Sequence, residues 1–292
     1  MADDLVRLAP AHRRTRRPGL FPRLPLLRPP GGNEAPLIVG AVPAEPHFGA
    51  IVACGRICWF SRGGPFEGRT VIRVRIVIAG GHGQIALRLE RLLHARGDEV
   101  AGIIRKPEQG DDLLAAGAEP VVCDLESASA ADVARHLEGA DAAVFAAGAG
   151  PGSGEARKDT VDRAACALLA DAAEAAGVRR FIVVSAMGAG TAPPEGTDPV
   201  FAAYLRAKGA ADADVRGRTG LDSTILRPGR LTDDPGAGTV ALTASAGRGA
   251  VPRDDVAAVI AALLDEPRTA GQTLELISGD VPVDDAVANA AR

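Results

Sequence analysis

The sequence predicts an α/β fold in which helices cover both faces of a doubly wound parallel sheet. Three observations support this. From residue 74 onward, short runs rich in Val and Ile alternate with helical segments of roughly 10 to 20 residues. These runs are apolar throughout, as in strands that are buried on both faces. The first run ends in a cluster of glycines.

The expected elements follow one another along the chain. The first strand is 74–80, and 85–97 is an amphipathic helix that ends at Gly97. Further strands are expected at 99–105, 119–125, 141–148, 179–186 and 221–229. Helices are expected between them at 111–118, 129–140, 156–177 and 200–220. A short C-terminal extension on the substrate side of the sheet adds a helix at 251–267 and a strand at 273–279.

Composition restricts the classes of partner. The formal net charge of -4 argues against nucleic acid as the main partner. No stretch approaches the roughly 20 apolar residues that a membrane-spanning helix needs, so no membrane association is expected. Cysteines 54, 58, 123 and 166 lack metal-ligand spacing, which indicates free thiols, a cytoplasmic protein and no metal site. The oligomeric state stays open.

Residues 1–70 differ from the rest of the chain. They hold ten arginines against five acidic residues, and ten of the 21 prolines. Because proline interrupts each apolar run, we predict a disordered extension here, followed by one folded domain over 71–292. The stretch 12–28 faintly resembles a targeting signal, but its apolar part is too short and too rich in proline. A further hypothesis is that this extension is not part of the natural protein.

The turn after the first strand reads "AGGHGQIALRL" and places glycines before Ala86 in a GxxGxxA spacing. In the first βαβ unit of a doubly wound sheet, such glycines let the backbone approach a pyrophosphate. The free amides at the start of the next helix then face the anion. We therefore expect a small-molecule site for a dinucleotide that includes Gly80, Gly81, His82, Gly83, Gln84 and Ile85.

The ends of the next strands indicate which dinucleotide binds. The second strand ends at Arg105 and Lys106, where an NAD-specific site usually carries an acidic residue. Two cations there favour the 2′-phosphate of NADP(H) over NAD(H), and the alternative is an ordinary solvated basic turn. The ends of the third and fourth strands are expected to contact adenine and to line the cleft, through Asp124, Leu125, Ala147 and Gly148.

Further motifs follow in order: "CDL", "FAAGAG", "VVSAMGAG", "YLRAK" and "LRPGRL". Together with "GGHGQIA", they resemble the short-chain dehydrogenase/reductase superfamily over residues 74–292. The particular similarity is to its atypical and extended-like NAD(P)H-binding branch, which includes NmrA-like and flavin reductase-like proteins. The resemblance implies a Rossmann fold and a site for hydride transfer.

The only tyrosine, Tyr204, lies one helical turn before Lys208, so the two side chains share a helix face. The resemblance implies that Tyr204 exchanges a proton with the substrate oxygen. It also implies that Lys208 holds the nicotinamide ribose and lowers the tyrosine pKa. Ser185 would bond the same oxygen, and Pro228 would lie against the nicotinamide. The alternative is a polar pair on a helix surface.

One element of the superfamily pattern is missing. Typical members carry a proton-relay asparagine on the helix after the fourth strand, and this helix has none. Lys158 and Asp159, near its start, could serve instead or could form a solvated helix end.

The expected function is that of an NADP(H)-dependent oxidoreductase acting on a small carbonyl, alcohol, quinone or flavin. The alternatives are a non-catalytic NADP-sensing regulator and a sugar-nucleotide epimerase or dehydratase. The short chain after Gly229 leaves little material for a sugar-nucleotide pocket.

Overall fold

The computed structural model describes residues 48–53, 56–61, 73–150 and 152–292. The chain divides into two compact units, Met1–Gly68 and Arg69–Arg292. Each unit is considered by itself below.

In the first unit, strands β1 (Phe48–Ala53) and β2 (Arg56–Ser61) pair as an antiparallel hairpin. We expected no regular element here, so for these two segments the expectation is wrong. The runs "AIVA" and "ICWF" carry β-branched and aromatic residues that favour strands, but each is too short for its periodicity to identify it. The other predictions for residues 1–70, including Cys54 and a non-native origin, lie outside the described residues.

The second unit is built on a nine-stranded sheet with the order β13-β10-β12-β8-β7-β6-β3-β4-β5. The strands from β12 to β5 all run parallel, which confirms the predicted doubly wound sheet. These parallel strands are β3 (Arg75–Ala79), β4 (Glu99–Ile104), β5 (Glu119–Val122), β6 (Ala142–Phe145), β7 (Arg180–Val184), β8 (Asp222–Pro228) and β12 (Thr273–Ser278).

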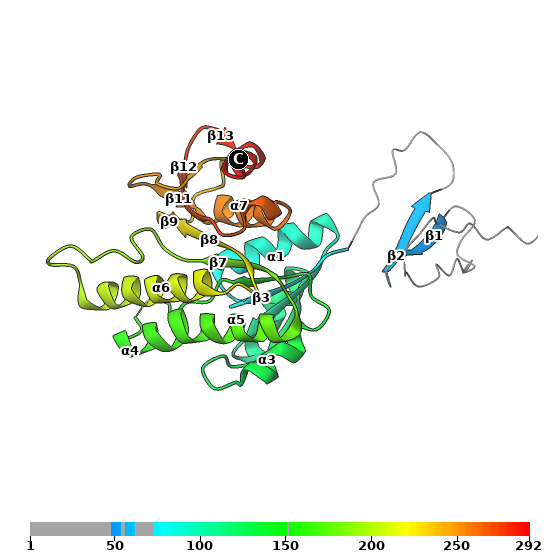
Figure 1. The fold of residues 1–292 in the computed structure, drawn as a ribbon, viewed down its shortest axis with the longest axis horizontal. Coiled ribbons are helices and arrows are strands. Elements are labelled where there is room, and N and C mark those ends of the chain that lie inside the picture. Colours follow the sequence, from blue (N-terminus) through cyan, green and yellow to red (C-terminus); the bar gives the residue numbers. More distant parts are fainter. Residues whose placement is uncertain (1–47, 54–55, 62–72, 151) are drawn as a thin grey trace, which may run out of the picture. The chain divides into compact units, whose positions relative to one another are not determined.

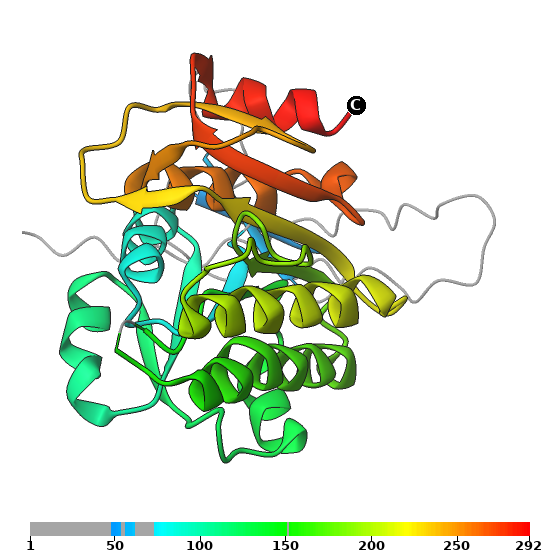
Figure 2. The same cartoon turned by 90° about the vertical axis from the view of Figure 1, so that its left-hand side faces the viewer.

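Helices cover both faces of this sheet (Figures 1 and 2). One apolar core lies under the helices α1 (Gln84–Arg96), α2 (Gly110–Ala115), α7 (Arg253–Leu264) and α8 (Val283–Ala290). The other core lies under α3 (Ala130–Leu137), α5 (Ala165–Ala176) and α6 (Pro199–Gly217). Short 3-10 turns follow β4 and α7, at η1 (Pro107–Gln109) and η3 (Pro267–Thr269).

The central strand β3 shows why its last four residues, from Ile76 to Ala79, are all apolar. Ile76 and Ile78 enter the core on the α1 side, whereas Val77 and Ala79 enter the core on the α5 side. All four side chains are fully buried. A strand with two buried faces has no position for a polar side chain, so the alternating pattern of a half-exposed strand is absent.

Two regions differ from the expected elements. The single helix expected over 156–177 consists of α4 (Glu155–Arg157), a π-helical segment η2 (Lys158–Ala164), and α5. The C-terminal extension holds more than one helix and one strand, because β9 (Arg230–Thr232), β10 (Thr239–Thr243), β11 (Ala250–Pro252), β13 (Val281–Pro282) and α8 also form. Strand β10 pairs antiparallel with β12, and β11 pairs with β9.

One carboxyl group interrupts the apolar core beneath the glycine turn. Glu90 of α1 is fully buried, and neither carboxyl oxygen has a hydrogen-bond partner among the described residues. Burial raises the pKa of Glu90 to about 8, against a small opposing effect of Arg91. The group is therefore protonated in the folded protein at neutral pH, whereas in the unfolded chain it ionises near its ordinary pKa of 4.5.

Stability is accordingly expected to depend on pH through Glu90. Because the folded pKa is raised, the folded state binds the extra proton, and stability falls as pH rises from about 4.5 to about 8. The slope is on the order of 1.4 kcal/mol per pH unit at its steepest. Urea unfolding of wild type and Glu90→Gln between pH 5 and 8 should show this slope only in wild type. Glu138→Gln, which removes an exposed carboxylate, is the control and should keep the wild-type slope.

Candidate dinucleotide and substrate site

The glycine turn lies where β3 passes into α1, at the carboxyl edge of the sheet. In the sheet, β3 lies between β4 and β6. The chain continues from β3 to β4 on one side and later crosses back to β6 on the other side, so the strand order reverses at β3. Sheets of this kind bind ligands at such a switch point. The amides of Gly80 and Gly81 donate to the carbonyl of Ile103, at 3.1 and 3.0 Å. Gly80 has a φ of +83°, a conformation that glycine adopts without strain.

The start of α1 suits an anion. Its N-cap residue is Gly83, no side chain caps the first amides, and the first turn carries no acidic residue. These amides thus lack a partner within the helix and concentrate the positive end of the helix dipole. A pyrophosphate matches this arrangement.

The cleft at this edge consists of two adjoining hollows that share Gly83 and residues 146–149. The first, of about 220 Å³, is lined by the expected residues Gly80, His82, Gly83, Arg105, Asp124, Leu125, Ala147 and Gly148. The second, of about 550 Å³, is lined by the expected residues Gly83, Ile85, Ala147, Gly148, Ser185, Tyr204, Lys208 and Pro228. The two groups of predicted residues therefore meet in one continuous site.

Three expected residues do not line either hollow: Gly81, Gln84 and Lys106. Gly81 faces inward, where an added Cβ would lie 2.8 Å from the Cα of Gly102 on β4. Its role is therefore close packing of the turn against the sheet. Gln84 accepts a hydrogen bond from Arg88, and the side chain of Lys106 is exposed.

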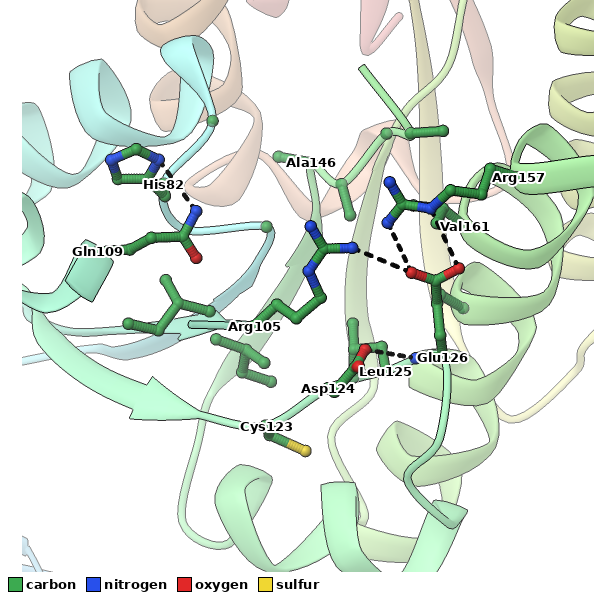
Figure 3. A pocket seen from close by; sticks show the side chains of 18 residues that line it. His82, Arg105, Gln109, Cys123, Asp124, Leu125, Glu126, Ala146, Arg157 and Val161 are labelled. Carbon is green, nitrogen blue, oxygen red and sulfur yellow. Dashed lines mark hydrogen bonds and ion pairs between the residues drawn. The ribbon is translucent and has the colours of Figure 1, made fainter. Parts of the chain in front are cut away.

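The first hollow contains a charged cluster that the sequence analysis missed (Figure 3). Glu126 accepts hydrogen bonds from Arg105 at 3.2 Å, Arg157 at 2.6 Å and Thr160 at 2.7 Å. The bonds from Arg157 and Thr160 outweigh partial burial and lower the pKa of Glu126 to about 2. Glu126 directly follows the "CDL" motif and could have been noticed, whereas Arg157 lies about 30 residues further along the chain, at the end of α4.

His82, in the glycine turn, is held from both sides. Its Nε2 lies 2.7 Å from a carboxylate oxygen of Asp112, and its Nδ1 lies 3.2 Å from the amide nitrogen of Gln109. Figure 3 shows the ring and Gln109 at one end of the hollow. The contacts fix the position of the ring beside the turn.

Lys208 is buried at the floor of the second hollow. Its Nζ donates to the carbonyls of Val184 at 3.0 Å and Ala147 at 3.4 Å. It also forms an ion pair with Asp162 at 3.4 Å, and both side chains are almost fully buried. Asp162 was missed because it comes from η2, and its place beneath Lys208 depends on how that segment packs against α6.

Tyr204 lies partly buried on the same face of α6, in the wall of the hollow. Its pKa is raised above 10, chiefly by burial, with further raising effects from Asp162 and Asp212. Lys208 lowers the tyrosine pKa, as the resemblance implies, but the effect of burial is larger. The lowering effect of Lys208 is thus present as the resemblance implies, and the net direction is upward because burial is the larger effect.

Ser185 directly follows β7 and lines the second hollow. Its backbone amide donates to Leu226 at 2.7 Å, which places it at the sheet edge. The hydroxyl is buried but has no hydrogen-bond partner among the described residues. A buried hydroxyl without a partner is unfavourable, so this group is suited to bond a ligand oxygen.

Lys158 and Asp159, the two candidates for the role of the missing asparagine, lie in different environments. Lys158 lines the second hollow, and its Nζ lies 5.5 Å from the centroid of the Tyr204 ring. Asp159 instead pairs with Arg163 at 2.5 Å on an exposed surface, outside the hollow. Only Lys158 is in a position to act beside Tyr204.

Among the described residues, no helix combines the length and apolar character that crossing a bilayer requires. In the same part of the chain, His, Cys, Asp and Glu side chains nowhere gather in threes as metal ligands would. Cys123 and Cys166 are free thiols.

Comparison with known proteins identifies the family to which the chain belongs. A family model described as NAD(P)H-binding matches residues 80–267. The chain belongs to this NAD(P)H-binding family. The predicted resemblance is thereby confirmed at the level of the family, and the chain is related to proteins named as oxidoreductases and epimerases.

Three relatives illustrate the range of this NAD(P)H-binding family. The chain is 38% identical, over 73% of its length and 99% of the relative, to YhfK of Bacillus subtilis, named an uncharacterized sugar epimerase. It is 35% identical to a Bacillus halodurans structure provisionally named an NAD-dependent epimerase/dehydratase, with a TM-score of 0.68 over 74% of this chain and 99% of that one. It is 26% identical to ChuY of Escherichia coli O157:H7, named an anaerobillin reductase, with a TM-score of 0.61 over 71% and 98%.

Proposed function

We propose that this NAD(P)H-binding protein is an NADP(H)-dependent oxidoreductase that reduces a small carbonyl compound in the second hollow. The cofactor, when bound, supplies a hydride to the carbonyl carbon. Tyr204 donates its phenolic proton to the carbonyl oxygen, and Ser185 donates a hydrogen bond to the same oxygen. Lys208 holds the ribose hydroxyls at the floor of the site. The oxidoreductases and reductases among the relatives support this class of reaction.

The observation that carries the proposal is the unpartnered, buried hydroxyl of Ser185 in the same hollow as Tyr204 and Lys208. These side chains come from the residue after β7 and from α6, yet they line one space that continues into the glycine turn. The raised pKa of Tyr204 keeps its proton in place at neutral pH, as a general acid requires.

The test is NADPH consumption, followed by absorbance, over a panel of aldehydes, ketones and quinones. Turnover of any of them supports the proposal. Tight NADPH binding without turnover on the whole panel would instead support a regulator that only senses the cofactor.

Preference for NADPH over NADH is proposed to depend on Arg105. Its guanidinium lines the hollow beside the end of β4, where a 2′-phosphate would receive charge-assisted hydrogen bonds. Arg105→Ala is expected to weaken NADPH binding by about 10- to 100-fold and NADH binding much less. Fluorescence titration with both cofactors measures this.

Glu126→Gln provides an opposite change in the same cluster. Glu126 forms an ion pair with Arg105 and so competes with the cofactor phosphate for this guanidinium. Removing the charge of Glu126 should therefore tighten NADPH binding relative to NADH binding. If both substitutions change the affinities for NADPH and NADH by equal factors, the preference does not come from this cluster.

A sugar epimerase is a second candidate, because YhfK and the Bacillus halodurans protein are named in that class. An epimerase would return the hydride to its product and show no net consumption of cofactor. Conversion of a nucleotide sugar, monitored by NMR without change in NADP(H) absorbance, would favour it.

We infer that the protein acts on small molecules in the cytoplasm.

A further inference from the structure

Lys158 is a buried cation in the substrate hollow that neither the glycine turn nor the Tyr204–Lys208 pair requires. Only 8% of its surface is exposed. Its Nζ donates to the backbone carbonyl of Gly150 at 3.0 Å and lies 5.5 Å from the Tyr204 ring centroid. It therefore sits beside the proposed proton donor, with its charged end at the wall of the hollow.

The other charged side chains that line the hollow have an ion-pair or hydrogen-bond partner of their own. Lys208 has Asp162 as its ion-pair partner, at 3.4 Å. Asp198 is exposed at the start of α6 and accepts a hydrogen bond from the amide of Phe201. Within the described part of the chain, no carboxylate lies within ion-pair distance of Lys158.

An uncompensated cation in a buried position is unfavourable, and its contacts with a carbonyl and an aromatic face offset only part of the cost. A lysine whose tip merely completes the packing would be expected to reach solvent or a carboxylate. Lys158 has no carboxylate partner among the described residues, and only 8% of its surface is exposed. An anionic group on the ligand would complete its coordination.

The local backbone also departs from regular structure at this position. Lys158 is the first residue of the π-helical segment η2, which also carries Asp162. Single π-helical turns within α-helices occur frequently at functional sites. Here the segment supplies the hollow with Lys158 and with the partner of Lys208.

We propose that Lys158 binds a carboxylate of the substrate, so that the protein reduces carbonyl compounds that carry an acidic group. The proposal rests on the oxidoreductase function proposed above. The rest of the wall is largely apolar, with Val184, Val200, Phe201 and Leu231, which suits an apolar body between the carboxylate and the carbonyl. One cation without a partner matches one carboxylate.

The test compares 4-carboxybenzaldehyde with its methyl ester, which differ mainly in charge. Wild type should reduce the acid with a KM about 10- to 100-fold below that of the ester, as expected for a charge-assisted hydrogen bond. Lys158→Met should raise the KM of the acid by that factor and so abolish the difference in KM between acid and ester, whatever its effect on kcat, which is the same for both substrates. Lys158→Arg should restore much of the preference for the acid.

Arg206→Met is the matched control, because it removes an exposed cation of α6 that lies outside the hollow. It should keep the preference for the acid. Thermal melting should show that each variant is folded, and NADPH affinity should change less than about two-fold in Lys158→Met. A large loss of NADPH affinity in Lys158→Met would overturn the proposal, because Lys158 would then serve the cofactor.

Equilibrium binding separates this proposal from the oxidoreductase function. The product analogue 4-(hydroxymethyl)benzoate and its methyl ester are titrated into the NADP⁺ complex by calorimetry. Lys158-dependent binding of the acid without turnover of any aldehyde keeps the anion site and rejects the oxidoreductase. The anion site is rejected if wild type and Lys158→Met show no difference between acid and ester, either in KM or in binding affinity. This holds whether or not the aldehydes are reduced.

Discussion

Tyr204→Phe is expected to lower kcat for carbonyl reduction by about 10²- to 10⁴-fold, the usual contribution of a positioned general acid. The substitution removes only the phenolic hydroxyl and keeps the ring that stacks on Phe201 at 5.9 Å between centroids. NADPH affinity should therefore be unchanged. Steady-state kinetics with NADPH and a reducible carbonyl, together with NADPH titration, measure both quantities.

The melting temperature of Tyr204→Phe distinguishes a structural role of Tyr204 from a catalytic one. The hydroxyl has no hydrogen bond to another described residue, so the melting temperature of Tyr204→Phe should match that of wild type. Because the pKa of Tyr204 is raised, the acid form persists below pH 10, and its contribution to the reduction rate should be constant from pH 6 to 9. Wild-type turnover in the Phe variant would remove Tyr204 from the mechanism.

Gly80→Ala is expected to weaken NADPH binding by on the order of 100-fold, because two effects add at this position. The backbone φ of +83° is unfavourable for alanine. An added Cβ would also lie 2.6 Å from the Cα and 2.7 Å from the amide nitrogen of Ala147, which are backbone atoms just after the end of β6. Relief requires the glycine turn and that strand end to separate, and both line the cleft.

Gly97→Ala is a matched control. Gly97 ends α1 with a φ of +93°, and nothing lies within 4 Å of an added Cβ. It therefore carries the same conformational strain without the clash, and should cost about 1 kcal/mol of stability with no change in NADPH affinity. Fluorescence titration and urea unfolding of both variants distinguish the two effects. Wild-type NADPH affinity in Gly80→Ala would show that the turn does not hold the cofactor.

The main strands of the sheet and most of its helices were predictable from the sequence because the signals are local. From Ile76 to Ala79, strand β3 is buried on both faces, so each of these positions must be apolar. The added β-strands of the C-terminal extension were not predicted. Strand β10 has an alternating pattern, but it is short and is completed by antiparallel pairing with β12.

The α/β fold, the glycine turn and the one-turn spacing of Tyr204 and Lys208 could be recognised from the amino-acid sequence. Each of these depends on residues close together in the chain. The electrostatics of the site, in contrast, required the folded structure. Asp162 beneath Lys208 and Glu126 between two arginines come from different elements. The balance that raises the Tyr204 pKa depends on burial and on distances between elements, and no spacing within the sequence encodes these.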